Sequence, residues 1–191
     1  MKPVIIIVLI IELFSAPICA QHIIDCNNNT TFWIINHRDI KYSVKLHGDI
    51  AESKIPELLN VEDMALQYVI LDKKEFMQNE CDDNNLSILK YYVEGEAKYL
   101  SNKFPKPFEV QMEVYTIPTG KKFLLWYYKL PEGKNKEVIA QIFINTIIDD
   151  TIIGFGSPQF IDHDFEDIKT FLVETISTLN VIKDINSLCD K

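Results

Sequence analysis

Asp162-His163-Asp164 brings together three side chains of types that transfer protons or hold metal ions. Carboxylates and imidazoles are common ligands of divalent cations and common general acids and bases. Adjacent side chains at a helix start point in different directions, so one metal ion would need further ligands, and His47 and Asp49 are the distant candidates. Capping of a helix by the aspartates requires no residue from elsewhere in the chain. We therefore predict capping and keep a hydrolase or metalloprotein around His163 as an alternative.

Two further short sequences partly match catalytic motifs but lack the surrounding residues that these motifs require. The sequence HRD at 37–39 matches the opening of the protein-kinase catalytic loop, but Val44 stands where the metal-binding Asn should be, and no glycine-rich loop or D-F-G accompanies it. The sequence GFGS at 154–157 fits neither a phosphate loop nor a nucleophile turn, and Pro158 follows it. We interpret the first as chance and the second as a structural turn. We accordingly predict a non-enzyme without a cofactor or resident metal.

Trp126-Tyr127-Tyr128 is the densest aromatic cluster. On a strand, the middle ring faces away from the other two, and packing in a core is the ordinary role of such rings. Rings on an exposed face would instead stack on sugars or anchor a partner protein. A small-ligand or carbohydrate binder with an aromatic pocket is therefore a second alternative function.

The charge balance of the chain favours some partners over others. Lys and Arg total 19 against 28 Asp and Glu, which gives a formal net charge of −9. Such a chain repels nucleic acid and anionic membranes and suits a basic protein partner. The candidate contacts are an acidic loop, an acidic turn and one exposed aromatic ring, namely Glu80, Asp82, Asp83, Asp149, Asp150 and Trp126.

The first twenty residues have the layout of a secretory signal peptide. Lys2 precedes an apolar run over 4–11, and small residues follow up to Ala20. We predict cleavage after Ala20, because the bulky Ile18 disfavours a lipoprotein that would begin at Cys19. Residues 21–191 then form a single exported domain without a membrane span, in the periplasm or outside the cell, and its oligomeric state stays open.

Three cysteines remain in that domain, Cys26, Cys81 and Cys189. All three lie in polar surroundings, and their spacing matches no zinc site. We expect one disulfide with one cysteine left over, and the sequence leaves the choice of pair open.

Hydrophobic periodicity predicts a mixed fold. Alternation predicts a strand over 40–46, and a three- and four-residue spacing after Asn60 predicts a short helix with Val61, Met64, Ala65 and Tyr68 on one side. A longer helical pattern runs over 86–104 with Asn84 or Asn85 as cap. Four alternating segments then predict an antiparallel meander, over 108–114, 123–130, 138–147 and 151–155.

The last element is a helical stripe from Phe165 to Ile182, with Asp162 or Asp164 as cap. This helix and the helix over 86–104 would cover the two faces of the sheet. We predict the α+β class, with an antiparallel sheet of four or more strands in an α/β/α sandwich-like arrangement.

The order of these elements, and above all FEDIKTFLVETISTLNVIKDINSLC from Phe165 to Cys189, resembles the Mog1/PsbP-like family over most of residues 40–189. The resemblance implies an accessory or adaptor domain that binds other proteins, with no active site to carry over. The segment 26–36 has no counterpart in it.

From export, acidity and the missing catalytic set, we favour a non-enzymatic protein-binding domain. An immunity or inhibitor-type factor that neutralises a toxin or hydrolase in the periplasm fits these features.

Overall fold

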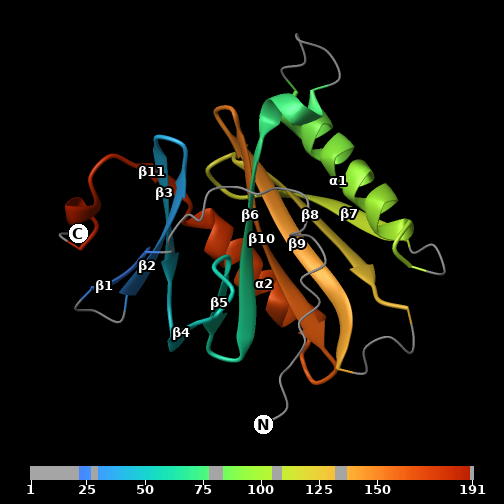
Figure 1. Cartoon of the computed structure of the whole chain (residues 1–191), viewed down its shortest axis with the longest axis horizontal. Coiled ribbons are helices and arrows are strands. Elements are labelled where there is room, and N and C mark those ends of the chain that lie inside the picture. Colours follow the sequence, from blue (N-terminus) through green and yellow to red (C-terminus); the bar gives the residue numbers. More distant parts are fainter. Residues whose placement is uncertain (1–21, 27–29, 78–83, 105–108, 132–136, 190–191) are drawn as a thin grey trace.

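The computed structural model describes residues 22–26, 30–77, 84–104, 109–131 and 137–189 (Figure 1). The predicted signal peptide lies outside the described residues, and so do Cys81 and the predicted acidic loop of Glu80, Asp82 and Asp83. In the described part of the chain, no helix has the length and apolar character needed to cross a membrane.

The larger of two antiparallel sheets has seven described strands in the order β4-β5-β6-β10-β9-β8-β7. Four of them are the predicted meander, and their bounds are β7 Val110–Thr116, β8 Lys122–Lys129, β9 Val138–Ile148 and β10 Thr151–Phe160. The others are β4 Ile50–Glu52, β5 Leu58–Val61 and β6 Met64–Asp72. The meander is confirmed, and it belongs to a sheet that continues past β10.

The smaller sheet has the order β1-β2-β3-β11. Its strands are β1 His22–Cys26, β2 Thr30–His37, β3 Ile40–Leu46 and β11 Asn180–Ile182. The strand over 40–46 is confirmed, whereas β1 and β2 were not predicted. In Figure 1 this sheet lies beside the larger one, with the C-terminal segment returning to it.

The helix predicted after Asn60 is wrong, because β5 and β6 form a hairpin there. Val61 and Met64 are directly opposed partners across its turn, where Glu62 has a φ of 55°. The two residues that were expected on one face of a helix therefore lie on the two sides of a tight turn. A spacing of three residues fits both a helix and a tight hairpin. The pairing of β6 with β10 favours the hairpin.

Two α-helices lie in the described part of the chain, α1 Asn85–Ser101 and α2 Phe165–Ser177. Asn84 caps α1 by accepting from the backbone N–H groups of Leu86 and Ser87. Asp164 caps α2 by accepting from the backbone N–H of Glu166 at 2.7 Å. The prediction that the last helical stripe extends to Ile182 is wrong, because α2 ends at Ser177 and the chain enters β11.

The helices pack on opposite faces of the larger sheet (Figure 1). The core under α1 joins its buried residues to Leu124, Trp126 and Phe143. The core on the other face joins α2 and the smaller sheet to the alternate strand residues, which include Leu125 and Ile144. The α+β class is confirmed, with one face covered by α1 and the other by α2 together with the smaller sheet. The described residues also form two short 3-10 helices, η2 (Lys73–Phe76) and η3 (Ile185–Ser187).

The turn predicted at residues 154–157 is wrong, because this segment lies inside β10. A Cβ on Gly154 would lie 2.1 Å from Asn145 Nδ2, and one on Gly156 would lie 2.5 Å from the ring of Phe143. The glycines therefore admit two large side chains of β9 against the β10 backbone. Pro158 is tolerated because β10 pairs with β6 only as far as Gly156.

Cys26 and Cys189 form a disulfide with a Cα–Cα distance of 5.4 Å. It ties the end of β1 to the segment that follows β11, so the pair left open by the sequence is decided. Cys81 would be the cysteine left over.

Candidate functional site

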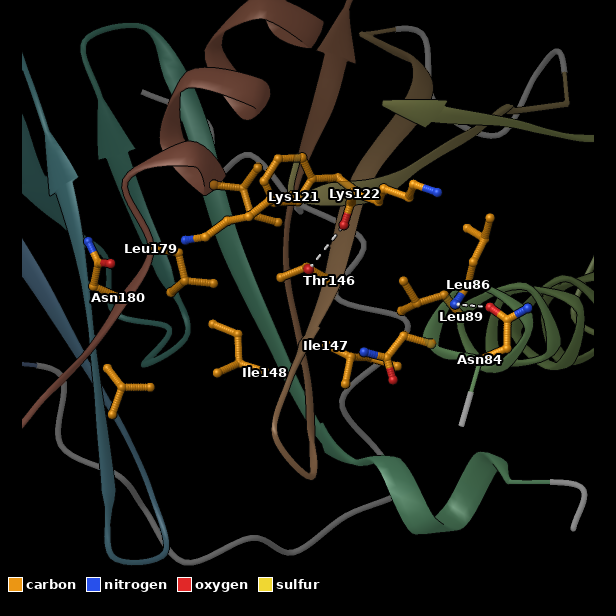
Figure 2. A pocket seen from close by; sticks show the side chains of 14 residues that line it. Asn84, Leu86, Leu89, Lys121, Lys122, Thr146, Ile147, Ile148, Leu179 and Asn180 are labelled. Atoms are coloured by element: carbon orange, nitrogen blue, oxygen red, sulfur yellow. Dashed lines mark hydrogen bonds between the residues drawn. The ribbon is translucent and has the colours of Figure 1, made fainter. Parts of the chain in front are cut away.

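A pocket of about 680 Å³ lies at the end of the larger sheet where β9 turns into β10 (Figure 2). Four distant segments form it: the start of α1, the start of β8, the end of β9, and the chain from the end of α2 into β11. The lining residues are Asn84, Asn85, Leu86, Leu89, Lys121, Lys122, Phe123, Thr146, Ile147, Ile148, Ile176, Leu179, Asn180 and Val181. Its volume falls in the range of about 300–1,000 Å³ that is usual for small-molecule sites.

Two lysines lie at this pocket and diverge. In Figure 2, Lys122 points toward the α1 side, and Lys121 points toward Leu179 and the α2 side. This follows from the alternation of side chains along a strand. The backbone carbonyl of Lys122 accepts a hydrogen bond from the Thr146 hydroxyl at 3.3 Å, which fixes the start of β8 to the end of β9.

Eight of the fourteen lining residues are apolar, and none of the fourteen is acidic. Leu86, Ile147, Ile148 and Val181 are partly or fully open to solvent. The pocket is therefore a basic, largely apolar region on a chain that carries a formal charge of −9.

Carboxylates gather at the opposite end of the same sheet. The exposed members, here called the acidic rim, are Asp49, Glu62, Asp63, Asp162, Asp164 and Asp167. Contacts hold its loops together: the backbone N–H of Glu62 donates to the Asp49 carbonyl at 2.7 Å, and His163 Nε2 lies 3.6 Å from Asp63 Oδ2. The turn between β5 and β6 thus meets the loop between β10 and α2.

Ile161 is the most exposed large apolar residue of the described chain, at 70%. Its backbone N–H donates to the Glu137 carbonyl at 2.9 Å, which fixes it just beyond the end of β10. Ile139, also exposed, is the extra residue of a bulge that pairs with the same strand end. The acidic rim therefore borders an exposed apolar side chain held by backbone hydrogen bonds.

The three residues of the predicted motif Asp162-His163-Asp164 have different roles, in helix capping and in the acidic rim. Asp164 caps α2, and the ring of His163 contacts Phe160 edge-on at 5.4 Å and approaches Asp63. Within the described ranges, no group of three His, Cys, Asp or Glu side chains is placed to hold a metal ion.

The HRD motif forms the turn between β2 and β3. Arg38 has a φ of 55°, and its guanidinium binds the carboxylate of Asp72 at the end of β6. His37 Nε2 lies 3.5 Å from the same carboxylate. The motif thus links the smaller sheet to the larger one.

The predicted surface role of Trp126 is wrong, because its side chain is only 1% exposed. Its indole N–H donates to Asn145 Oδ1 at 2.7 Å, and its ring stacks on Phe143 with centroids 4.3 Å apart. Tyr127 points to the other face, where it contacts Phe165 at 4.7 Å. The three aromatic residues therefore pack into two cores and form no common aromatic pocket.

Asp149 and Asp150 are exposed in the turn between β9 and β10, as a surface role requires. The Asp150 carbonyl accepts from the backbone N–H of Lys73 at 2.9 Å. The turn lies at the pocket end of the sheet, away from the acidic rim.

Glu96 is a half-buried carboxyl on α1, and burial raises its pKa above the ordinary value of 4.5. Its charge also adds to the effect of burial in raising the pKa of Tyr92 and Tyr128. This group belongs to the contact between α1 and the sheet.

Sequence reasoning missed Lys121, Lys122 and Ile161. The two adjacent cations at the start of a doubly apolar strand were a usable signal for the first two. The flanking Asp162 was one for Ile161, since an apolar residue beside a charged loop need not belong to the core.

No family model and no curated protein matches the chain. Among solved structures, it is similar to the solution structure of cyanobacterial PsbP (CyanoP) from Synechocystis sp. PCC 6803. The match has 13% sequence identity and a TM-score of 0.45, and it covers 91% of this chain and 99% of that chain. The predicted PsbP-like resemblance thus has a counterpart among solved structures, and nothing about function follows from it.

Proposed function

We propose that the chain is an exported, non-enzymatic domain that binds a basic protein through the acidic rim. The observation that carries this proposal is the convergence of carboxylates from three loops near Ile161, the most exposed large apolar side chain of the described residues. A factor that neutralises a basic toxin or hydrolase in the same compartment is the specific role we favour.

The physical basis is a division of labour within one surface. Carboxylates at the edge steer a basic partner and raise its rate of association, mostly at low ionic strength. A few side chains that become buried near the centre of an interface supply most of the affinity, and we assign Ile161 to this group. Ile161 starts from a fixed backbone position, so little conformational entropy is lost on binding.

The Cys26–Cys189 disulfide supports the exported location. Disulfides form and persist in oxidising compartments, whereas reducing systems keep cytosolic thiols in the reduced form. A basic toxin or hydrolase met in such a compartment is a partner of the required charge.

The test is affinity capture with residues 21–191 as bait, from exported proteins of the source organism, at low and high salt. Support requires a stoichiometric basic partner that salt weakens and that Ile161→Asp reduces by about tenfold or more. A rim variant, Asp63→Asn with Asp162→Asn, should slow association severalfold and lower its salt dependence.

The matched control is Asp149→Asn with Asp150→Asn. It removes the same two charges at the other end of the sheet, and Asn tolerates the positive φ of 52° at residue 149. If both pairs of substitutions weakened binding of the partner equally, the effect would be due to net charge, and the proposed binding role of the acidic rim would be contradicted. Loss with the control pair alone would move the interface to the turn between β9 and β10.

A further inference from the structure

We infer that the pocket at the other end of the larger sheet binds a free fatty acid, with its acyl chain on the isoleucine and leucine side chains and its carboxylate at Lys122. This inference is independent of the proposed protein partner, since the two regions share no residue.

The lining fits an acyl chain. Ile147 and Ile148 are consecutive on β9, so they present apolar surface on both faces of the sheet end. Leu86 and Leu89 extend that surface on the α1 side, and Leu179 extends it on the other side (Figure 2). Val181 of β11 also lines the pocket. The apolar lining residues thus extend along the end of the sheet from the α1 side to β11, an elongated arrangement that an acyl chain covers better than a compact ring does.

The charge around the pocket selects the head group. Lys122 points to the same side as the start of α1, where the helix dipole places partial positive charge. Among the residues that line the pocket, no carboxylate competes for that lysine. A carboxylate on the ligand would therefore gain a charge-assisted hydrogen bond from Lys122.

The same surroundings disfavour other ligand classes. A metal ion would lack carboxylate and imidazole ligands, and a sugar would lack an exposed aromatic ring, since Phe123 is buried. Asp149 and Asp150 follow directly after Ile148 and repel negative charge, and this repulsion grows with each further negative charge on a ligand. A single anionic group on an apolar chain satisfies all of these conditions.

The direct test is a calorimetric titration of residues 21–191 with dodecanoate below its micelle concentration. We expect saturable binding of one dodecanoate per chain. Dodecanol and dodecyltrimethylammonium are the comparators, and each should bind at least about tenfold more weakly. Equal binding of all three would overturn the head-group assignment, and the absence of saturable dodecanoate binding would overturn the site.

Variants locate the ligand. Lys122→Met removes the charge and keeps an unbranched side chain only one atom shorter, so it should weaken dodecanoate binding about tenfold and leave dodecanol binding unchanged. Val181→Glu places a carboxylate on a wall residue that is 46% exposed, so the fold tolerates it, and dodecanoate binding should be lost. Ile161→Glu is the matched control at the acidic rim and should leave dodecanoate binding unchanged. Binding that survives Val181→Glu, or is lost with Ile161→Glu, would contradict the location.

A last arm separates a free fatty acid from a membrane lipid. Vesicles of phosphatidylglycerol present an anionic head group on an aggregate surface, and we expect no sedimentation of the chain with them. Co-sedimentation without dodecanoate binding would overturn the inference in favour of a lipid surface.

Discussion

The two ends of the larger sheet differ in what each offers to a partner. One end carries the acidic rim and Ile161, the most exposed large apolar residue of the described chain. The other end has a pocket of about 680 Å³ whose charged lining residues are both lysines. A formal charge of −9 describes neither end, because charge is a property of the whole chain and recognition depends on the local arrangement.

The middle of the sheet keeps these ends apart. Strands β9 and β10 run from one end to the other, and both are buried over most of their length. The Trp126–Asn145 hydrogen bond and the stacking of Trp126 on Phe143 further fix β9 to its other neighbour, β8. A rigid central region of this kind allows the two ends to be altered separately, which the following predictions use.

The largest expected effect is loss of the disulfide. Replacing Cys26 and Cys189 by Ala should lower the free energy of unfolding by about 2–5 kcal/mol, because the unfolded chain regains the entropy of a long loop. Chemical denaturation measures this change. The pocket should suffer more than the acidic rim, because Cys189 follows β11, which carries the wall residue Val181.

The control for that prediction is Cys81→Ser. It should leave the free energy of unfolding unchanged under oxidising conditions, since the disulfide joins the other two cysteines. If Cys81→Ser destabilised the chain as much as the double replacement, the pairing would be wrong.

A smaller effect is expected at Gly154, and it should reach both ends equally. Gly154→Ala places a Cβ 2.4 Å from the Ile144 carbonyl oxygen, which belongs to the backbone and cannot turn away. Overpacking of this kind costs about 1–3 kcal/mol. Denaturation measures the cost, and binding at each end should fall only to the extent that the folded fraction falls.

The matched control is Gly95→Ala on α1, where an added Cβ meets nothing within 4 Å. It should stabilise the chain by about 0.5–1 kcal/mol, because Ala favours the helix over Gly. Unequal loss of binding at the two ends in Gly154→Ala would show that the ends are not held by a common rigid centre.

The same comparison shows where sequence reasoning holds. The meander and α1 were predictable because each has one dominant periodicity and clear end signals, such as Asn84 at the start of α1. The region after Asn60 was not, because a spacing of three residues also fits the two sides of a tight hairpin. The helical stripe beyond Ser177 failed for a related reason, since pairing with β3 overrides local spacing.

The sites were less predictable than the fold. Trp126 was chosen by residue type, but its burial depends on α1, which packs over it from a distant part of the sequence. Asp149 and Asp150 are exposed, but nothing in their spacing tells that the turn lies opposite the acidic rim. The pocket joins four segments that only the folded chain brings together.

The smallest expected effect is electrostatic and concerns α1, which forms one wall of the pocket. Burial raises the pKa of Glu96 in the folded chain, so the native state holds its proton more firmly than the unfolded state does. Its contribution to stability is therefore fully present below the ordinary pKa of 4.5 and is lost as the pH rises through the raised value.

Glu96→Gln removes the buried charge and keeps the size of the side chain. The variant should be more stable than the parent chain by up to about 1 kcal/mol near neutral pH, and the difference should vanish below about pH 4. Denaturation curves collected from about pH 4 to about pH 8 measure this difference. Glu94→Gln, at an exposed position on the same helix, is the control and should show no such trend. A gain in stability that is the same at every pH would assign the effect of Glu96→Gln to helix propensity. If the variant also bound dodecanoate more tightly, the pocket wall would depend on how firmly α1 packs on the sheet.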